Sequence, residues 1–135
     1  MIMRIAEHKG GIMKRYIFEF GVYEFHPHYI LAHPSEGAIA GRYELGVLSE
    51  IVSAHYRTPF GFIANRVNHS STDLTIYKRI MKLHPQLKVI SIVSYRPLTS
   101  ILAETERYLL KGLHFKIFYE LSAAQKWTLE MLGIK

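Results

Sequence analysis

The chain has 135 residues and no cysteine, so disulfides, zinc ribbons and thiol catalysis are excluded. Its 17 Lys and Arg exceed its 11 Asp and Glu, but the net charge of +6 is scattered and no recognised nucleic-acid-binding motif accompanies it. We therefore expect a single domain without a nucleic-acid partner. The sequence shows no apolar run long enough to span a bilayer and no secretory signal, which predicts a cytoplasmic protein without integral membrane association.

The first predicted elements are strands. Residues 14–25 are rich in aromatic side chains and alternate between apolar and polar positions, a pattern typical of strands. Gly21 within this segment indicates a bulge or the break between two paired strands. After a His-Pro-His turn at residues 26–28, residues 29–33 are predicted to form another strand.

The rest of the chain alternates between helical and strand patterns. In chain order we expect a helix over 41–56, a strand over 60–64, a helix over 73–84, a strand over 89–93, a helix between Pro97 and Gly112, a strand over 115–118 and a final helix. The strand over 60–64 is apolar on both faces, which suits a central parallel strand. A capping box from Ser122 to Gln125 is expected to start the final helix.

This order of elements predicts the fold class. Strands that alternate with helices need crossover connections and therefore form a largely parallel sheet, while the opening strands can pair in antiparallel fashion. We predict a single α/β domain over residues 14–135, with a mixed, mostly parallel sheet of about five strands and four helices. Residues 1–13, which end near a Gly-Gly pair, are expected to form a flexible N-terminal arm.

Three segments of the chain resemble those of a known family: PFGFIANRVNHSSTDLTIYKRI, VISIVSY and KIFYELSAAQKW. On these segments the chain resembles the SpoIIAA-like proteins over about residues 16–132. These proteins are relatives of STAS domains and are also described as STAS/SEC14-like. The resemblance implies a STAS-like fold.

The resemblance also implies functional residues. Asn65 and Arg66 match an Asn-Arg pair of the family and Ser71 matches its serine, while Ser70 stands where the family usually has a tyrosine. STAS domains generally bind other proteins, and in the anti-sigma-factor antagonists a serine at this junction is phosphorylated. The resemblance therefore implies a non-enzymatic regulatory domain with a protein partner, with Ser71 or Ser70 as candidate phosphorylation sites.

The residues themselves suggest an anion site where two buried strands end. Asn65 and Arg66 follow one of these strands and Arg96 follows the other. If the strands are neighbours, both guanidinium groups converge with a helix N-terminus beside Ser70 and Ser71, which favours phosphate or carboxylate. In the alternative interpretation the hydroxyl groups only cap the helix, Arg66 pairs with a carboxylate and Asn65 fixes a turn.

No motif in the sequence indicates catalysis, a cofactor or a metal. His69, Ser70 and Asp73 are neighbours in one loop rather than groups on separate elements, and no nucleophile elbow, P-loop or dinucleotide-binding glycine motif is present. His26 and His28 have a spacing that allows metal binding on a strand, but Pro27 indicates a turn and no third ligand has a recognisable spacing. We expect neither an enzyme nor a bound cofactor.

The aromatic residues near the N-terminus leave two further expectations. If one face of the first strands is uncovered, these side chains form a homodimer surface or the floor of an apolar ligand site. The kinship with SEC14-like proteins implies a second candidate function, a small carrier for a lipid or an amphipathic anion. A carrier of this kind requires a continuous apolar cavity, which a fully packed interior would rule out.

Overall fold

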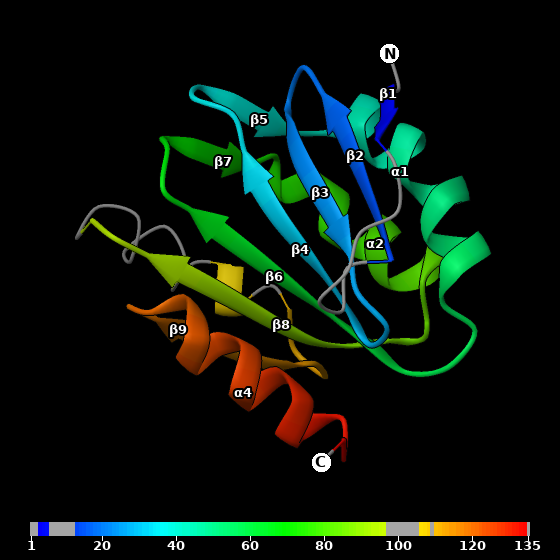
Figure 1. Ribbon diagram of the computed structural model, residues 1–135, viewed down its shortest axis with the longest axis vertical. Coiled ribbons are helices and arrows are strands. Elements are labelled where there is room, and N and C mark those ends of the chain that lie inside the picture. The colour runs from blue at the N-terminus through cyan, green and yellow to red at the C-terminus, as the bar shows by residue number, and fades with distance from the viewer. Residues whose placement is uncertain (1–2, 6–12, 97–105, 109, 135) are drawn as a thin grey trace.

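The computed structural model describes residues 3–5, 13–96, 106–108 and 110–134 and has an α/β fold built on one main sheet (Figure 1). The seven strands of this sheet, in spatial order, are β1 (Met3–Ile5), β2 (Lys14–Phe18), β3 (Gly21–Phe25), β4 (Tyr29–Pro34), β6 (Phe60–Arg66), β8 (Leu87–Ser94) and β9 (His114–Phe118). A separate two-stranded sheet pairs β5 (Ala38–Ala40) with β7 (Ser70–Thr72) in parallel.

The main sheet is mixed, as the order of elements predicted. Neighbouring strands from β1 to β4 are antiparallel, and short turns join β2 to β3 and β3 to β4. β4, β6, β8 and β9 pair in parallel. β2 runs in the same direction as β4, so five of the seven strands share one direction, and the expectation of a mostly parallel sheet is confirmed. The sheet has seven strands rather than about five.

The strands that the sequence did not reveal are all short. β1, β5 and β7 have three residues each, too few for an alternating pattern to stand out. β1 falls within the segment expected to be a flexible arm, where it pairs with β2. Residues 6–12 of that segment lie outside the described residues.

Three of the four expected helices lie within the described residues. They are α1 (Arg42–His55), the 3-10 turn η1 (Leu74–Ile76) that leads into α2 (Tyr77–Leu83), and α4 (Leu121–Met131). The helix expected between Pro97 and Gly112 lies mostly outside the described residues. Within this segment, residues 106–108 are described and are helical. Gly112 has a φ of 95°, the left-handed conformation that glycine adopts at the end of a helix.

The expected capping box of the last helix is wrong. α4 begins one residue before Ser122, with Glu120 as its N-cap and no side-chain hydrogen bond there. Gln125 does not reach back to the helix start but donates from Nε2 to the hydroxyl of Tyr29 on β4, at 3.1 Å. Leu121, the first residue of the helix, packs against the cluster of apolar residues beneath α4, a tertiary contact that the local capping pattern does not take into account.

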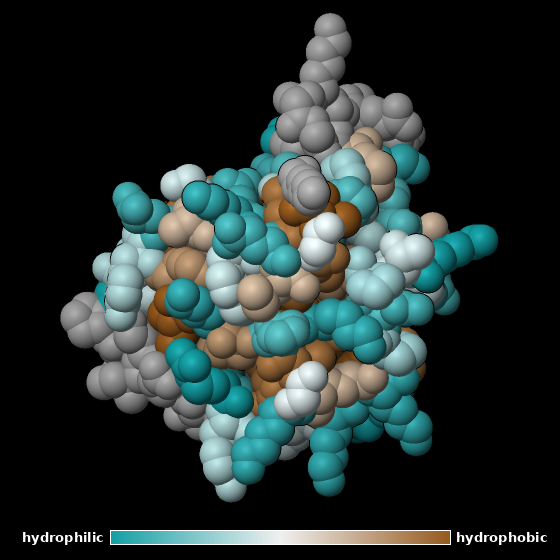
Figure 2. Space-filling model, turned by 90° about the horizontal axis from the view of Figure 1, so that it is seen from below, coloured by the Kyte–Doolittle hydropathy of each residue, from teal (hydrophilic) through white to brown (hydrophobic). Residues whose placement is uncertain are grey.

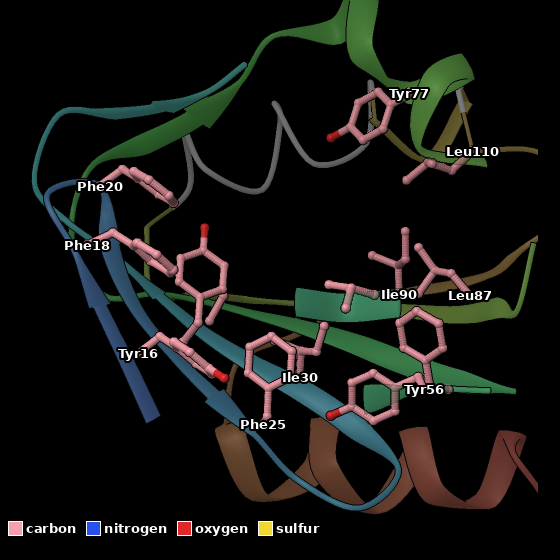
Figure 3. Packing of buried hydrophobic residues seen from close by; sticks show 14 residues of the cluster. Tyr16, Phe18, Phe20, Phe25, Ile30, Tyr56, Tyr77, Leu87, Ile90 and Leu110 are labelled. Atoms are coloured by element: carbon pink, nitrogen blue, oxygen red, sulfur yellow. The ribbon is translucent and has the colours of Figure 1, made fainter. Parts of the chain in front are cut away.

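The helices cover the two faces of the main sheet. α4 packs on one face, against β6, β8 and β9, and Figure 1 shows it in front of the sheet while α1 and α2 lie behind. We call these the α4 face and the cavity face. Figure 3 shows the side chains of Tyr16, Phe18, Phe25 and Ile30 on the side away from α4, where they form the larger cluster of buried residues. Alternation along each strand produces this division, since successive side chains point to opposite faces.

Candidate functional site

The two buried strands expected to end side by side do so. β6 and β8 pair in parallel, and their register places Arg66 opposite Ser94 and Asn65 opposite Val93. The small sheet of β5 and β7 lies beyond the carboxyl ends of β4 and β6 (Figure 1). In open sheets with parallel strands, this edge is where ligands tend to bind.

Asn65 and Arg66 are adjacent in sequence but have different surroundings. Arg66 lines a cavity on the cavity face, together with Ala64 two residues before it. Asn65 instead accepts a hydrogen bond from the hydroxyl of Tyr95 at 2.7 Å, and its Nδ2 lies 3.3 Å from Nδ1 of His33. Adjacent strand residues point to opposite faces, so the predicted pair does not form a single binding group.

Arg66 is held in a buried ion pair. Its Nη1 and Nη2 donate to Oε1 and Oε2 of Glu106 at 2.7 and 2.9 Å, and both residues are only 4% exposed. Nη2 also lies 3.4 Å from Oγ1 of Thr72. For Arg66 the alternative interpretation, in which it pairs with a carboxylate of the protein, is thus confirmed. Glu106 compensates the positive charge that would otherwise attract an anion.

Tyr77, the first residue of α2, also contacts the Arg66–Glu106 pair. Its hydroxyl donates to Oε2 of Glu106. Burial, and next the negative charge of Glu106, raise the pKa of Tyr77, so the phenol stays protonated as a donor. Figure 3 shows the Tyr77 ring reaching from α2 with its hydroxyl directed toward the interior. We refer to Arg66, Tyr77 and Glu106 as the polar cluster.

The hydroxyl-rich segment is a strand rather than a helix cap. Ser70, Ser71 and Thr72 form β7 and pair with β5. Asp73 provides the cap, since its Oδ1 accepts from the amide and the hydroxyl of Thr75 at 3.0 and 2.8 Å. These hydrogen bonds lower the pKa of Asp73. The capping interpretation therefore holds for Asp73 and is wrong for Ser71.

The two serines of β7 differ in accessibility. Ser71 is exposed, whereas Oγ of Ser70 is buried and has no hydrogen-bond partner among the described residues. Native structures rarely leave a buried hydroxyl without a partner. Ser70 also lines the cavity, which makes its hydroxyl available to a molecule placed there.

Arg96 lies apart from this group. Its Nη1 donates to the backbone oxygen of Val67 at 2.6 Å, in the turn between β6 and β7. Arg96 does not belong to the lining formed by the described residues of the cavity. Among the five predicted anion-site residues, only Arg66, Ser70 and Ser71 contribute to that lining.

The cavity between the main sheet, α1, α2 and the small sheet has a volume of about 150 Å³. Small side chains of β4, β5, β6 and β7 line it, namely Ala32, Ala38, Ala40, Ala64 and Ser70. Its other walls are apolar and include Phe62 of β6, Leu48 of α1 and Ile80 of α2. The polar cluster lies at its border, so an apolar space adjoins a small group of buried polar atoms.

His26, one of the two histidines considered for a metal, contacts an aromatic ring and a carboxylate instead. His26 is buried, its ring is stacked on Tyr29 with ring centres 4.6 Å apart, and its Nε2 lies 3.3 Å from Oε1 of Glu24. Burial lowers the pKa of His26, an effect that Glu24 opposes. Within the described residues no group of three or more metal-binding side chains is placed to hold a metal ion.

In the part of the chain that is described, every helix is too short or too polar to cross a membrane. On the face shown in Figure 2, hydrophobic side chains appear as separate patches between hydrophilic ones.

A mixed sheet with helices on both faces defines this chain as an α/β protein. A solved structure from Shewanella loihica is described as an uncharacterized protein from the DUF3478 family with a SpoIIAA-like fold. It matches 95% of this chain and 92% of its own with a TM-score of 0.51, at 13% sequence identity. No family model and no curated protein matches the sequence.

The SpoIIAA-like fold expected from the sequence is therefore confirmed. At 13% identity the likeness concerns the fold alone, so no binding residue is transferred from that structure. Glu106 and Tyr77 were not predicted as site residues from the sequence. They lie 40 and 11 residues beyond Arg66. The signal that was available is indirect: a buried arginine at the end of a central strand requires a carboxylate partner.

Proposed function

We propose that the protein is a non-enzymatic binding module that holds a small apolar or amphipathic molecule in the cavity. The observation that carries this proposal is the apolar space of about 150 Å³ between the sheet and α1. An apolar cavity of roughly this size in another protein stays dry and binds benzene or xenon. A ligand of similar volume would therefore fit here without any rearrangement of the fold.

The side chains around the cavity support a binding role over a packing defect. Empty space in a core lowers stability by an amount that grows with its volume. Here alanine occupies positions 32, 38, 40 and 64, where a larger apolar residue would fill the space. Ligand sites typically combine such an apolar wall with a few polar groups, and Ser70 and the polar cluster provide them.

The proposal is tested by thermal unfolding in the presence of toluene, an apolar probe of suitable size. A ligand that binds only the folded state raises the unfolding midpoint as its concentration increases. We expect toluene to raise the midpoint of the wild type and to have no effect on Ala40→Leu, whose added side chain occupies the cavity. Ile39→Leu is the control, because Ile39 is 60% exposed on the same strand. An unchanged midpoint in the wild type would contradict the proposal.

A second candidate function is regulation through a protein partner. Ser71 is exposed on β7 beside the start of α2, so a kinase can reach its hydroxyl, whereas that of Ser70 is buried. A phosphate at Ser71 would add negative charge to this surface and change what binds there. The test is a mass increase at Ser71 in protein from its native cells together with a partner lost in Ser71→Asp. A homodimer remains a prediction.

A further inference from the structure

We propose that the molecule held in the cavity is neutral and carries a hydroxyl group, bound by Ser70, on an apolar body the size of one ring. This inference rests on the proposed function and specifies its ligand. Three features of the cavity determine the ligand's properties: the charge balance of its polar border, the unpaired hydroxyl of Ser70, and its volume.

The charge balance argues against an anionic ligand. Both terminal nitrogens of Arg66 are engaged by Glu106 in a bidentate pair, and Tyr77 donates to the same carboxylate. Glu44 also lines the cavity, and its Oε1 accepts from the amide of Gly41 at 2.8 Å at the start of α1. A ligand carboxylate would lie near two carboxylates, and the described lining residues offer it no cation that is not already paired; burying an unpaired charge is strongly unfavourable.

A cationic ligand is less well accommodated than a neutral one. Glu106 already has a positive partner in Arg66, and Glu44 interacts with the N-terminal amides of α1, which stabilise a negative charge. The other ionisable groups among the described lining residues are Tyr23, whose pKa is raised by burial, and His84, whose pKa is lowered by burial, so both favour their neutral forms. A neutral polar group therefore needs the least electrostatic compensation.

Ser70 specifies the kind of polar group. Its hydroxyl is the one buried side-chain donor or acceptor without a partner among the described residues. A hydroxyl can donate one hydrogen bond and accept others, so a ligand hydroxyl satisfies Ser70 whichever of the two is the donor. The hydrogen bond would also remove the penalty of leaving the serine hydroxyl unsatisfied.

The volume limits the apolar part of the ligand. The space of about 150 Å³ is that of a cavity which accepts benzene, so one six-membered ring or a chain of comparable volume fills it. Benzyl alcohol combines such a ring with one neutral hydroxyl. Toluene lacks only the hydroxyl, while benzoate and benzylamine replace it with a negative or a positive group.

Benzoate and benzylamine are first titrated against the wild type to test the charge of the ligand. The decisive experiment then measures the dissociation constants of toluene and benzyl alcohol for the wild type and for Ser70→Ala by NMR titration. The four values form a cycle that isolates the contact between the two hydroxyl groups from differences in water solubility. We expect Ser70→Ala to weaken benzyl alcohol about three- to tenfold and to leave toluene unchanged. Toluene binding to the variant also reports that its cavity is intact. Ser122→Ala is the control, because this serine is exposed on α4.

The possible failures are distinguishable. If Ser70→Ala changes both ligands by the same factor, or if benzoate or benzylamine binds the wild type more tightly than benzyl alcohol, the inferred ligand class is wrong while the binding role survives. If toluene binds and benzyl alcohol does not, the same conclusion follows. If none of the four compounds binds the wild type, both the proposed function and this inference are overturned.

Discussion

The two faces of the main sheet differ in how closely their side chains pack. On the α4 face, a Cβ atom added to Gly61 would lie 2.6 Å from Cγ2 of Thr128, so helix and strand are in closest contact. Ala124 and Thr128 are fully buried there, and Oγ1 of Thr128 lies 2.8 Å from Oγ of Ser91. On the cavity face, small side chains surround an apolar space. The empty space is thus local, and the same chain packs closely where no cavity is present.

Breaking the polar cluster should have the largest effect. Arg66→Met leaves Glu106 buried without its cation, and breaking a buried ion pair typically costs about 3–5 kcal/mol. We expect a loss of this order in the free energy of unfolding, measured by urea titration. Replacing both residues, in Arg66→Met with Glu106→Leu, should recover most of it. Equal losses in the single and the double variant would show that charge pairing is not what the cluster contributes.

Enlarging a residue on the α4 face should have the next largest effect. Gly61→Ala forces Thr128 to move, and overpacking of a tight site costs about 1–3 kcal/mol. Gly46→Ala is the matched control, because nothing lies within 4 Å of its added Cβ on α1. In a helix this control should raise the stability by up to about 1 kcal/mol. Tolerance of Gly61→Ala without loss would contradict the close packing of this face.

Enlarging a residue that lines the cavity should have a smaller effect of opposite sign. Ala40→Leu fills space that is otherwise empty, and cavity-filling substitutions commonly add about 0.5–2 kcal/mol. Ala124→Leu on the α4 face adds the same atoms at a fully buried position and should destabilise the protein. Urea titration of both variants compares the two faces directly. A destabilising Ala40→Leu would indicate that the space is not accessible to a side chain.

The pH dependence of stability should reveal the smallest difference. Burial lowers the pKa of His84 and of His55, both near the cavity face, from an ordinary value of about 6.5. The folded state therefore favours neutral histidine, so the unfolded state binds more protons once the pH falls below that value. Stability should be complete above about pH 6.5 and decline as the pH falls through the lower folded pKa values.

The variant His84→Gln isolates one of these contributions. His84 is buried and its Nε2 lies 3.0 Å from Oγ of Ser49 on α1. Urea titrations at several pH values should show a shallower acid loss in this variant than in the wild type. His69→Gln, at an exposed position, serves as the control. The same pH profile in His84→Gln and the wild type would remove this histidine from the account.

More of the fold than of the candidate site could be predicted from the sequence. The periodicity of long elements such as α1 and the apolar run of β6 identified the layers and the central strand correctly. The adjacency of β6 and β8 was only a condition of the predicted anion site, because the pattern of a strand does not determine its neighbours; the two strands do pair in parallel. β5 and β7 escaped prediction because strands of three residues carry too little pattern.

The site depended on side-chain directions that the sequence does not determine. Asn65 and Arg66 were expected to act together, but strand alternation places them in separate environments. Glu106 is 40 residues from Arg66 and no spacing links them. The cavity was even less predictable, because it results from where alanine faces the interior on strands of two different sheets.

The most direct test of the account is a crystal structure of the protein soaked with benzyl alcohol. We predict electron density for the ring in the space between the main sheet and α1, with its hydroxyl within hydrogen-bond distance of Oγ of Ser70. An interior filled by the protein's own side chains, or a ring bound only elsewhere on the molecule, would contradict the claim that the loosely packed face is a binding site.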